Sequence, residues 1–130
     1  MNKLIQNWPH KWFGMWKEHG EGYENCPSIR EFVDADLVST YSFTDLENYL
    51  LNSQELAATS SYPDAFTGEV MFGSVTYITD GVWLWFDSLP YYIKKYNVAI
   101  PNSFLEHIKS NNYIPVEEWT GDFQSLDFPQ

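Results

Sequence analysis

One cysteine and three histidines are the side chains of this 130-residue chain that best suit nucleophilic or metal chemistry. Cys26 could act as a nucleophile if a histidine served as its base. The histidines are His10, His19 and His107. Their spacing fits no zinc motif, and the sequence has no CxxC, HExxH, GxSxG, GxGxxG or phosphate-binding loop. A lone cysteine followed by proline is more typical of a packed side chain. The sequence therefore predicts a protein that is not an enzyme and holds no metal or cofactor.

Aromatic stacking is the second chemistry that the sequence offers. The stretch TDGVWLWFDSLPYY, residues 79–92, places Trp83 and Trp85 two positions apart, shortly before Tyr91 and Tyr92. Alternate side chains of a strand share a face, so the two tryptophans point the same way. Their face either packs under a helix or stays partly exposed, and both alternatives remain open. If exposed, the four rings would suit a carbohydrate or a small molecule.

The residues around this stretch predict a β-hairpin. Asp80-Gly81 is typical of a two-residue type I′ turn, flanked by β-branched and aromatic residues. Such a turn would place Ile78 opposite Trp83. The expected strands are residues 55–60, 70–79 and 82–86.

Helices are predicted on both sides of the hairpin. Ser28 and Glu31 form a capping box for a short helix, and a second box at Thr44 and Glu47 opens a helix that runs through Leu51. Two further helices are expected, at residues 88–96 and from residues 101–102 to Asn111. This segregation of helices and strands indicates an α+β fold: a small antiparallel β-meander of about three strands packed against several short helices.

The N-terminal residues 1–27 are expected to form an irregular segment of a single 1–130 domain. Trp8, Trp12 and Trp16 recur at helical spacing, and Pro9 suits a first helical turn, but Gly14 weakens a helix there. The favoured interpretation is an aromatic strap packed over the core.

The formal net charge of −11 is the first indication of function. Residues 21–87 carry twelve acidic side chains and one basic side chain, Arg30. This field disfavours nucleic acid and anionic membranes and would attract a basic protein. The alternative is that the acids only keep an aromatic-rich protein soluble. Asp64 and Glu69, in a loop rich in turn-forming residues, and Asp80, in the hairpin turn, are expected to be exposed.

A single cysteine excludes an internal disulfide, which favours a reducing compartment. The sequence starts without the pattern of a signal peptide, and no apolar run reaches the roughly 18 residues of a membrane helix. The expected location is the cytoplasm.

Residues 79–104, TDGVWLWFDSLPYYIKKYNVAIPNSF, resemble a signature shared by small uncharacterised bacterial proteins. The similarity extends more loosely to Cys26-Pro27-Ser28, to residues 57–59 and to residues 67–69. Some of these small acidic proteins resemble immunity proteins of bacterial toxin systems. The resemblance implies a cytosolic, noncatalytic protein that binds one toxin domain.

The resulting hypothesis is a noncatalytic cytosolic module that binds a basic protein. An immunity-type inhibitor of a basic bacterial toxin domain would be a protein of this kind. The alternative is a small-molecule or carbohydrate-binding domain. The candidate binding residues are Trp83, Trp85, Asp64, Glu69, Asp80, Tyr91 and Tyr92.

Overall fold

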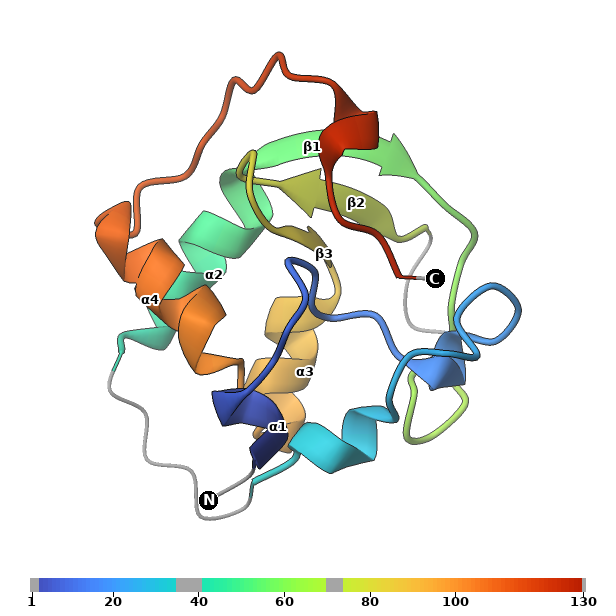
Figure 1. Ribbon diagram of the computed structural model, residues 1–130. Helices are drawn as coiled ribbons and strands as arrows, with labels where there is room; N and C mark the ends of the chain where they lie inside the picture. Colours follow the sequence, from blue (N-terminus) through green and yellow to red (C-terminus); the bar gives the residue numbers. More distant parts are fainter. Residues whose placement is uncertain (1–2, 35–40, 70–73, 130) are drawn as a thin grey trace.

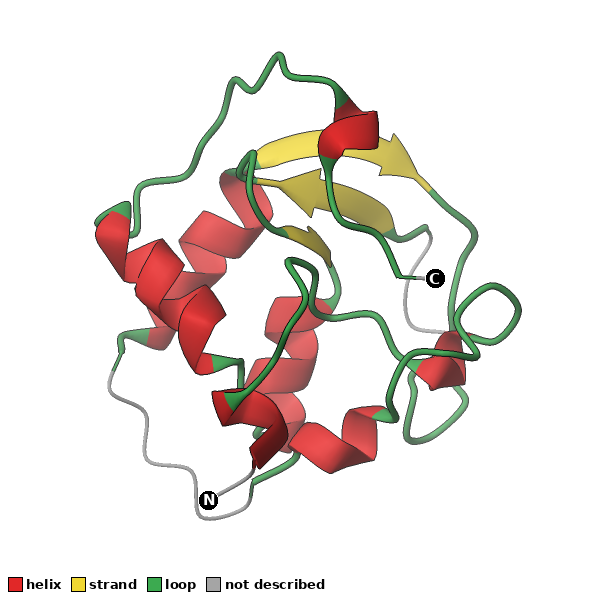
Figure 2. Cartoon of the chain, viewed as in Figure 1, coloured by secondary structure: helices red, strands yellow, loops and turns green. Residues whose placement is uncertain are grey.

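The computed structural model describes residues 3–34, 41–69 and 74–129 of the chain. It has an α+β fold, as the sequence predicts, with an antiparallel sheet in the order β1-β2-β3 (Figures 1 and 2). The first four of the predicted strand residues 70–79 lie outside the described residues. The helices are α1 (Lys3–Gln6), α2 (Phe43–Asn52), α3 (Leu89–Tyr96) and α4 (Asn102–Ser110). The strands are β1 (Gln54–Ala58), β2 (Thr76–Thr79) and β3 (Leu84–Phe86), and short 3-10 turns are η1 (Lys17–His19), η2 (Ile29–Phe32) and η3 (Phe123–Ser125).

Local hydrogen bonds fix where the helices begin. The predicted capping box at Ser28 is present: its backbone N–H donates to Glu31 Oε2 at 3.0 Å, and its Oγ accepts from Arg30 N at 3.2 Å. The cap of α2 is Ser42, whose Oγ accepts from Asp45 N at 3.4 Å. This cap lies two residues before the predicted one, because the serine hydroxyl satisfies an N–H of the first turn.

The loop that joins the two strands of the hairpin is longer than predicted. Thr79 pairs with Leu84 and Ile78 with Trp85, so four residues rather than two join β2 to β3. Gly81 has a positive φ of 94°, but Asp80 does not, and a type I′ turn needs both. The Asp80 carboxylate forms the turn instead. Its Oδ1 accepts from the backbone N–H groups of the last two loop residues, Val82 at 2.9 Å and Trp83 at 2.7 Å.

One face of the hairpin carries both tryptophans and is covered by helices. The Trp85 ring stacks on Tyr49 of α2 with centroids 6.1 Å apart, and its Nε1 donates to Leu50 O at 2.8 Å. Trp83 stacks on Phe104 of α4 at 4.4 Å and an interplanar angle of 10°. Both tryptophans are 0% exposed. They are part of the core, which decides between the two alternatives that the sequence left open.

The N-terminal segment straps the core as predicted, but not as a helix. Residues 11–13 run beside β3: Phe13 N donates to Leu84 O, and Leu84 N donates to Lys11 O, both at 2.9 Å. Gly14 then turns the chain with a φ of 88°, and a Cβ there would lie 3.3 Å from Leu89 Cβ. The strap thus pairs with the free edge of β3 and breaks the helical geometry. Its three tryptophans are buried: Trp8, Trp12 and Trp16.

The other face of the sheet is covered by segments from both ends of the chain. Phe86 packs on Tyr77 at 4.7 Å and on His19 at 5.1 Å. The C-terminal segment, residues 111–129, crosses in front of β1 and β2, and its Phe128 lies 6.0 Å from the Tyr77 ring (Figure 1). Within the described ranges, no helix has both the length and the apolar character needed to cross a membrane.

Candidate functional site

The structure distributes the seven predicted binding residues over several environments. Glu69 is exposed and Tyr91 is partly exposed. The other five are buried: Trp83, Trp85, Asp64, Asp80 and Tyr92. The expectation that Asp64 and Asp80 are exposed is therefore wrong, and neither carboxylate is available to a partner. The predicted residues do not form one surface.

Asp64 is the centre of a buried hydrogen-bond network between a loop and α3. Its Oδ1 accepts from Phe66 N at 2.8 Å and Thr67 N at 3.1 Å, which folds the loop around the carboxylate. Its Oδ2 accepts from the hydroxyls of Tyr91 at 2.5 Å and Tyr96 at 3.1 Å. Burial raises the pKa of Asp64, but these hydrogen bonds outweigh it and hold the pKa below its usual value. The carboxylate is a structural anion that joins the loop to the helix.

Asp80 joins the hairpin turn to α2 and α4. Its Oδ2 accepts from the Tyr49 hydroxyl at 2.6 Å and lies 3.1 Å from His107 Nε2. Asn111 Nδ2 donates to the same tyrosine hydroxyl at 2.9 Å. An aspartate–histidine pair supplies two of the three members of a hydrolytic triad, but among the contacts of the described residues the Ser110 hydroxyl bonds to the His107 backbone oxygen and not to its imidazole. The arrangement holds two helices against the turn.

Cys26 lies in an environment that suppresses thiol reactivity. Burial, together with the charge of Glu24, raises its pKa to about 11. The thiolate is the reactive form, so a thiol with this pKa is a poor nucleophile at neutral pH. Among the residues that the structure describes, no group of three His, Cys, Asp or Glu side chains could hold a metal ion.

Two hollows of the surface have features that argue against a specific site. A groove of about 590 Å³ between α2 and α3 is lined by charges of both signs: Glu47, Asp87, Lys94 and Lys95. A second, of about 530 Å³, lies along the N-terminal strap. There the His10 ring stacks on Trp12 at 4.7 Å, and the indole of Trp12 is only 4% exposed.

A third hollow lies between the sheet and the C-terminal segment. We call it the aromatic pocket; its volume is about 350 Å³ and its lining residues are Leu56, Ala57, Tyr77, Phe123 and Phe128. The Phe128 ring stands at 73° to Tyr77 and at 90° to Phe123, with centroids 6.0 and 5.6 Å apart. Phe123 is 52% exposed. Of the three rings that line the pocket, Phe123 is exposed, and Tyr77 and Phe128 are partly exposed.

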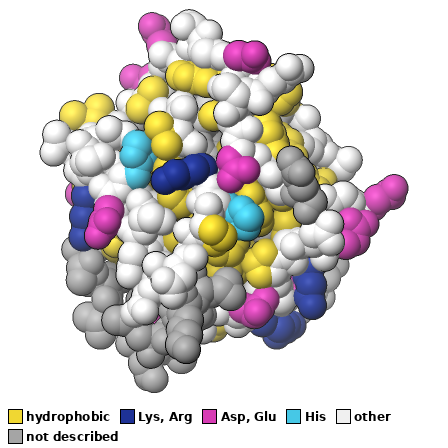
Figure 3. Space-filling view, in the orientation of Figure 1, with side chains coloured by type: hydrophobic (Ala, Val, Ile, Leu, Met, Phe, Trp, Pro, Cys, Tyr) yellow, Lys and Arg dark blue, Asp and Glu magenta, His cyan; other side chains and the backbone are white. Residues whose placement is uncertain are grey.

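The surroundings of the aromatic pocket are acidic. The sequence has no lysine or arginine between Arg30 and Lys94 and none after Lys109, so the charged side chains of β1 and of the C-terminal segment are all carboxylates, and β2 has no charged side chain. Figure 3 shows acidic side chains along the upper edge of the molecule, where the C-terminal segment runs. The exposed acids of this segment are Glu117, Glu118, Asp122 and Asp127.

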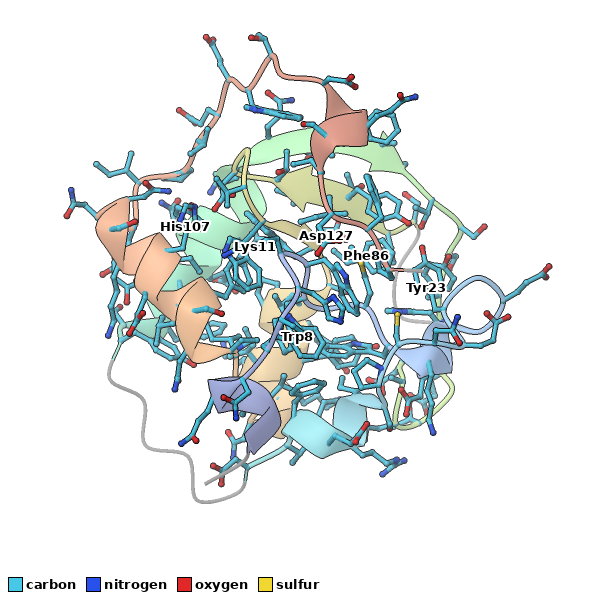
Figure 4. The ribbon with its side chains drawn as sticks, viewed as in Figure 1. Trp8, Lys11, Tyr23, Phe86, His107 and Asp127 are labelled. Carbon is cyan, nitrogen blue, oxygen red and sulfur yellow. The ribbon has the colours of Figure 1, made fainter. Side chains whose placement is uncertain are left out.

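A hydrogen bond joins the C-terminal segment to the N-terminal strap. Asp127 Oδ2 accepts from Lys11 N at 2.9 Å, and Figure 4 shows the Asp127 side chain beside the strap. Sequence reasoning missed the aromatic pocket because the C-terminal segment has no helical or strand periodicity. Without such a pattern, the sequence does not indicate that this segment packs on β1 and β2. The one available signal was the Asp-Phe pair, which occurs at residues 122–123 and again at 127–128.

Comparison with known proteins finds no family model, no curated protein and no solved structure that matches this chain.

Proposed function

We propose that this protein is a noncatalytic, cytoplasmic binding module for a basic protein, in the manner of an immunity-type inhibitor that neutralises a basic toxin domain. One observation carries the proposal. An open aromatic pocket is lined by segments of the chain that contain carboxylates and no lysine or arginine.

The two features serve different steps of binding. Carboxylates spread over one side of a protein accelerate the encounter with a basic partner and orient it. Aromatic side chains that become desolvated on contact slow dissociation, because such residues dominate the energy of protein interfaces. Phe123 has the exposed apolar area for this second role, and Glu117 and Glu118 are exposed for the first.

The alternative is a carbohydrate or small-molecule site on the hairpin tryptophans, and it required those tryptophans to be exposed. A stacking platform needs exposed ring faces, whereas Trp83 and Trp85 are 0% exposed and Tyr92 is 1% exposed.

Affinity capture from the source organism, followed by binding measurements on the purified pair, tests the proposal. We expect a basic protein that binds one-to-one and whose affinity falls steeply as salt rises from about 50 to about 300 mM, because exposed charges are then screened. A partner that is acidic or neutral, or an affinity that does not change with salt, would contradict the proposal.

A further inference from the structure

We propose that the aromatic pocket receives an arginine side chain of the basic partner. The inference rests on the proposed function and deepens it, because it names the group that the site recognises and the residues that recognise it.

The arrangement of the three rings is that of an aromatic cage. Phe128 stands nearly perpendicular to both Tyr77 and Phe123, with centroid separations of 6.0 and 5.6 Å, so the rings form adjacent walls rather than a stack. A cation within about 6 Å of a ring centroid is attracted by the negative face of the ring. Leu56 and Ala57 of β1 complete the pocket with aliphatic surface, which suits the methylene stem of a long cationic side chain.

The chain itself shows that its aromatic rings accept cations. Four basic side chains lie over aromatic rings at 4.9 to 5.8 Å from the centroid. These pairs are Lys11 over Trp83, Arg30 over Phe66, Lys94 over Phe43, and Lys95 over Tyr91. No lysine or arginine that the structure describes lies over the three rings of the aromatic pocket, so they are free to accept a cation from another molecule.

The charge around the pocket favours a cation over an apolar side chain. Phe123 directly follows the exposed Asp122, and Phe128 directly follows the exposed Asp127. An apolar side chain would fill the pocket but would gain nothing from these carboxylates. A planar guanidinium is weakly hydrated and stacks on aromatic faces better than an ammonium does, which favours arginine over lysine.

Three matched pentapeptides, with blocked ends and a central arginine, lysine or leucine between glycines and serines, are suitable probes. We expect the arginine peptide to shift the NMR ring resonances of Tyr77, Phe123 and Phe128, the lysine peptide to shift them less, and the leucine peptide to leave them unchanged. Equal shifts with the leucine peptide, or shifts that map instead to the groove between α2 and α3, would overturn the inference.

Phe123→Ala supplies the test by mutation. Because Phe123 is 52% exposed, the variant should fold, which a thermal melt verifies. We expect its affinity for the arginine peptide to fall about fivefold, the scale of one cation–π contact. The matched control is Ile114→Ala, which removes a 64% exposed side chain from the same C-terminal segment and should leave the affinity unchanged. Unchanged binding by Phe123→Ala would refute the cage.

The captured partner separates this inference from the proposed function. If the partner is basic but binds wild type and Phe123→Ala equally, the proposed function stands and the arginine cage is wrong. If no basic partner exists, the proposed function fails, even where the arginine peptide binds the pocket.

Discussion

His19 is buried against Phe86 and Tyr62, and its environment holds the imidazole in the neutral form. Its Nδ1 accepts a hydrogen bond from Trp16 N at 3.1 Å, which requires an unprotonated nitrogen. Burial lowers the pKa of His19 to about 4, although the negative charge of Glu18 opposes the shift. A histidine whose pKa is lowered by folding makes the free energy of unfolding depend on pH.

The sign of this dependence follows from the direction of the shift. Below the ordinary pKa of about 6.5 the unfolded chain binds a proton that the folded protein binds only below about 4. The free energy of unfolding should therefore fall as the pH decreases from about 6.5 to about 4, by roughly 3 kcal/mol from this group. Urea titrations of wild type and His19→Gln across this range check the prediction. Parallel pH profiles for the two proteins would contradict it.

Asp64 provides a second prediction for a single residue. Asp64→Ala leaves the hydroxyls of Tyr91 and Tyr96 and two backbone N–H groups without their acceptor. We expect the free energy of unfolding to fall by about 2–4 kcal/mol, because hydrogen bonds to a buried charge are among the strongest. The exposed Glu69 is the control, and Glu69→Ala should change stability by less than about 0.5 kcal/mol. Equal stability of the two variants would mean that the Asp64 network is not formed.

At the scale of elements, the positions of helices and strands could be predicted from hydrophobic periodicity and capping residues. The register of the hairpin and the pairing of the N-terminal strap with β3 could not. The Asp-Gly turn is where the sequence indicates, yet the Asp80 side chain lengthens the loop and moves the register by two residues. The tryptophans of the strap have helical spacing, yet backbone hydrogen bonds to Leu84 hold the segment extended. Both outcomes depend on contacts with distant residues, which local patterns do not contain.

The hairpin turn gives a prediction at this scale, because the C-terminal segment packs on it. Gly81 has a φ of +94°, and a Cβ there would lie 2.9 Å from Trp119 Cδ1. Gly20 has a φ of +92° and no atom within 4 Å of such a Cβ. Gly20→Ala should therefore cost about 1 kcal/mol, the backbone term alone, and Gly81→Ala about 2–3 kcal/mol.

Thermal melts of the two alanine variants, with Gly81→Ala/Trp119→Ala as a third protein, measure the difference. The double variant removes the clash and should differ from Trp119→Ala by only the backbone term, as Gly20→Ala differs from wild type. Equal losses for Gly20→Ala and Gly81→Ala would show that the C-terminal segment does not pack on the turn.

At the scale of the whole molecule, composition and element order predict the α+β class and the acidic surface, but not the site. The acids expected to steer a partner included Asp64 and Asp80. Both carboxylates are buried and accept hydrogen bonds from tyrosine hydroxyls inside the protein. The aromatic pocket instead combines β1, β2 and a C-terminal segment without periodicity. Only the folded chain places Phe128 against both Tyr77 and Phe123, and no spacing in the sequence predicts the contact with Tyr77.

The account places the steering charges on the C-terminal segment rather than on the acidic middle of the sequence. Two triple variants separate these possibilities, each replacing three exposed acids by amides. The first changes the C-terminal segment: Glu117→Gln, Glu118→Gln and Asp122→Asn. The second is the control and changes exposed acids of the acidic middle: Glu21→Gln, Asp45→Asn and Glu69→Gln. Asn at position 122 keeps an oxygen that can accept from Gln124 N, so η3 keeps its cap.

The association rate constant of the purified basic partner with these proteins, at about 20 mM and about 300 mM salt, is the most direct test of the central claim. We predict that the C-terminal variant associates about tenfold more slowly than wild type at low salt and equally fast at high salt, with little change in the dissociation rate. The control variant should associate nearly as fast as wild type at both concentrations. Equal slowing of the two variants, or no slowing of either, would contradict the claim that a basic partner binds at the C-terminal segment.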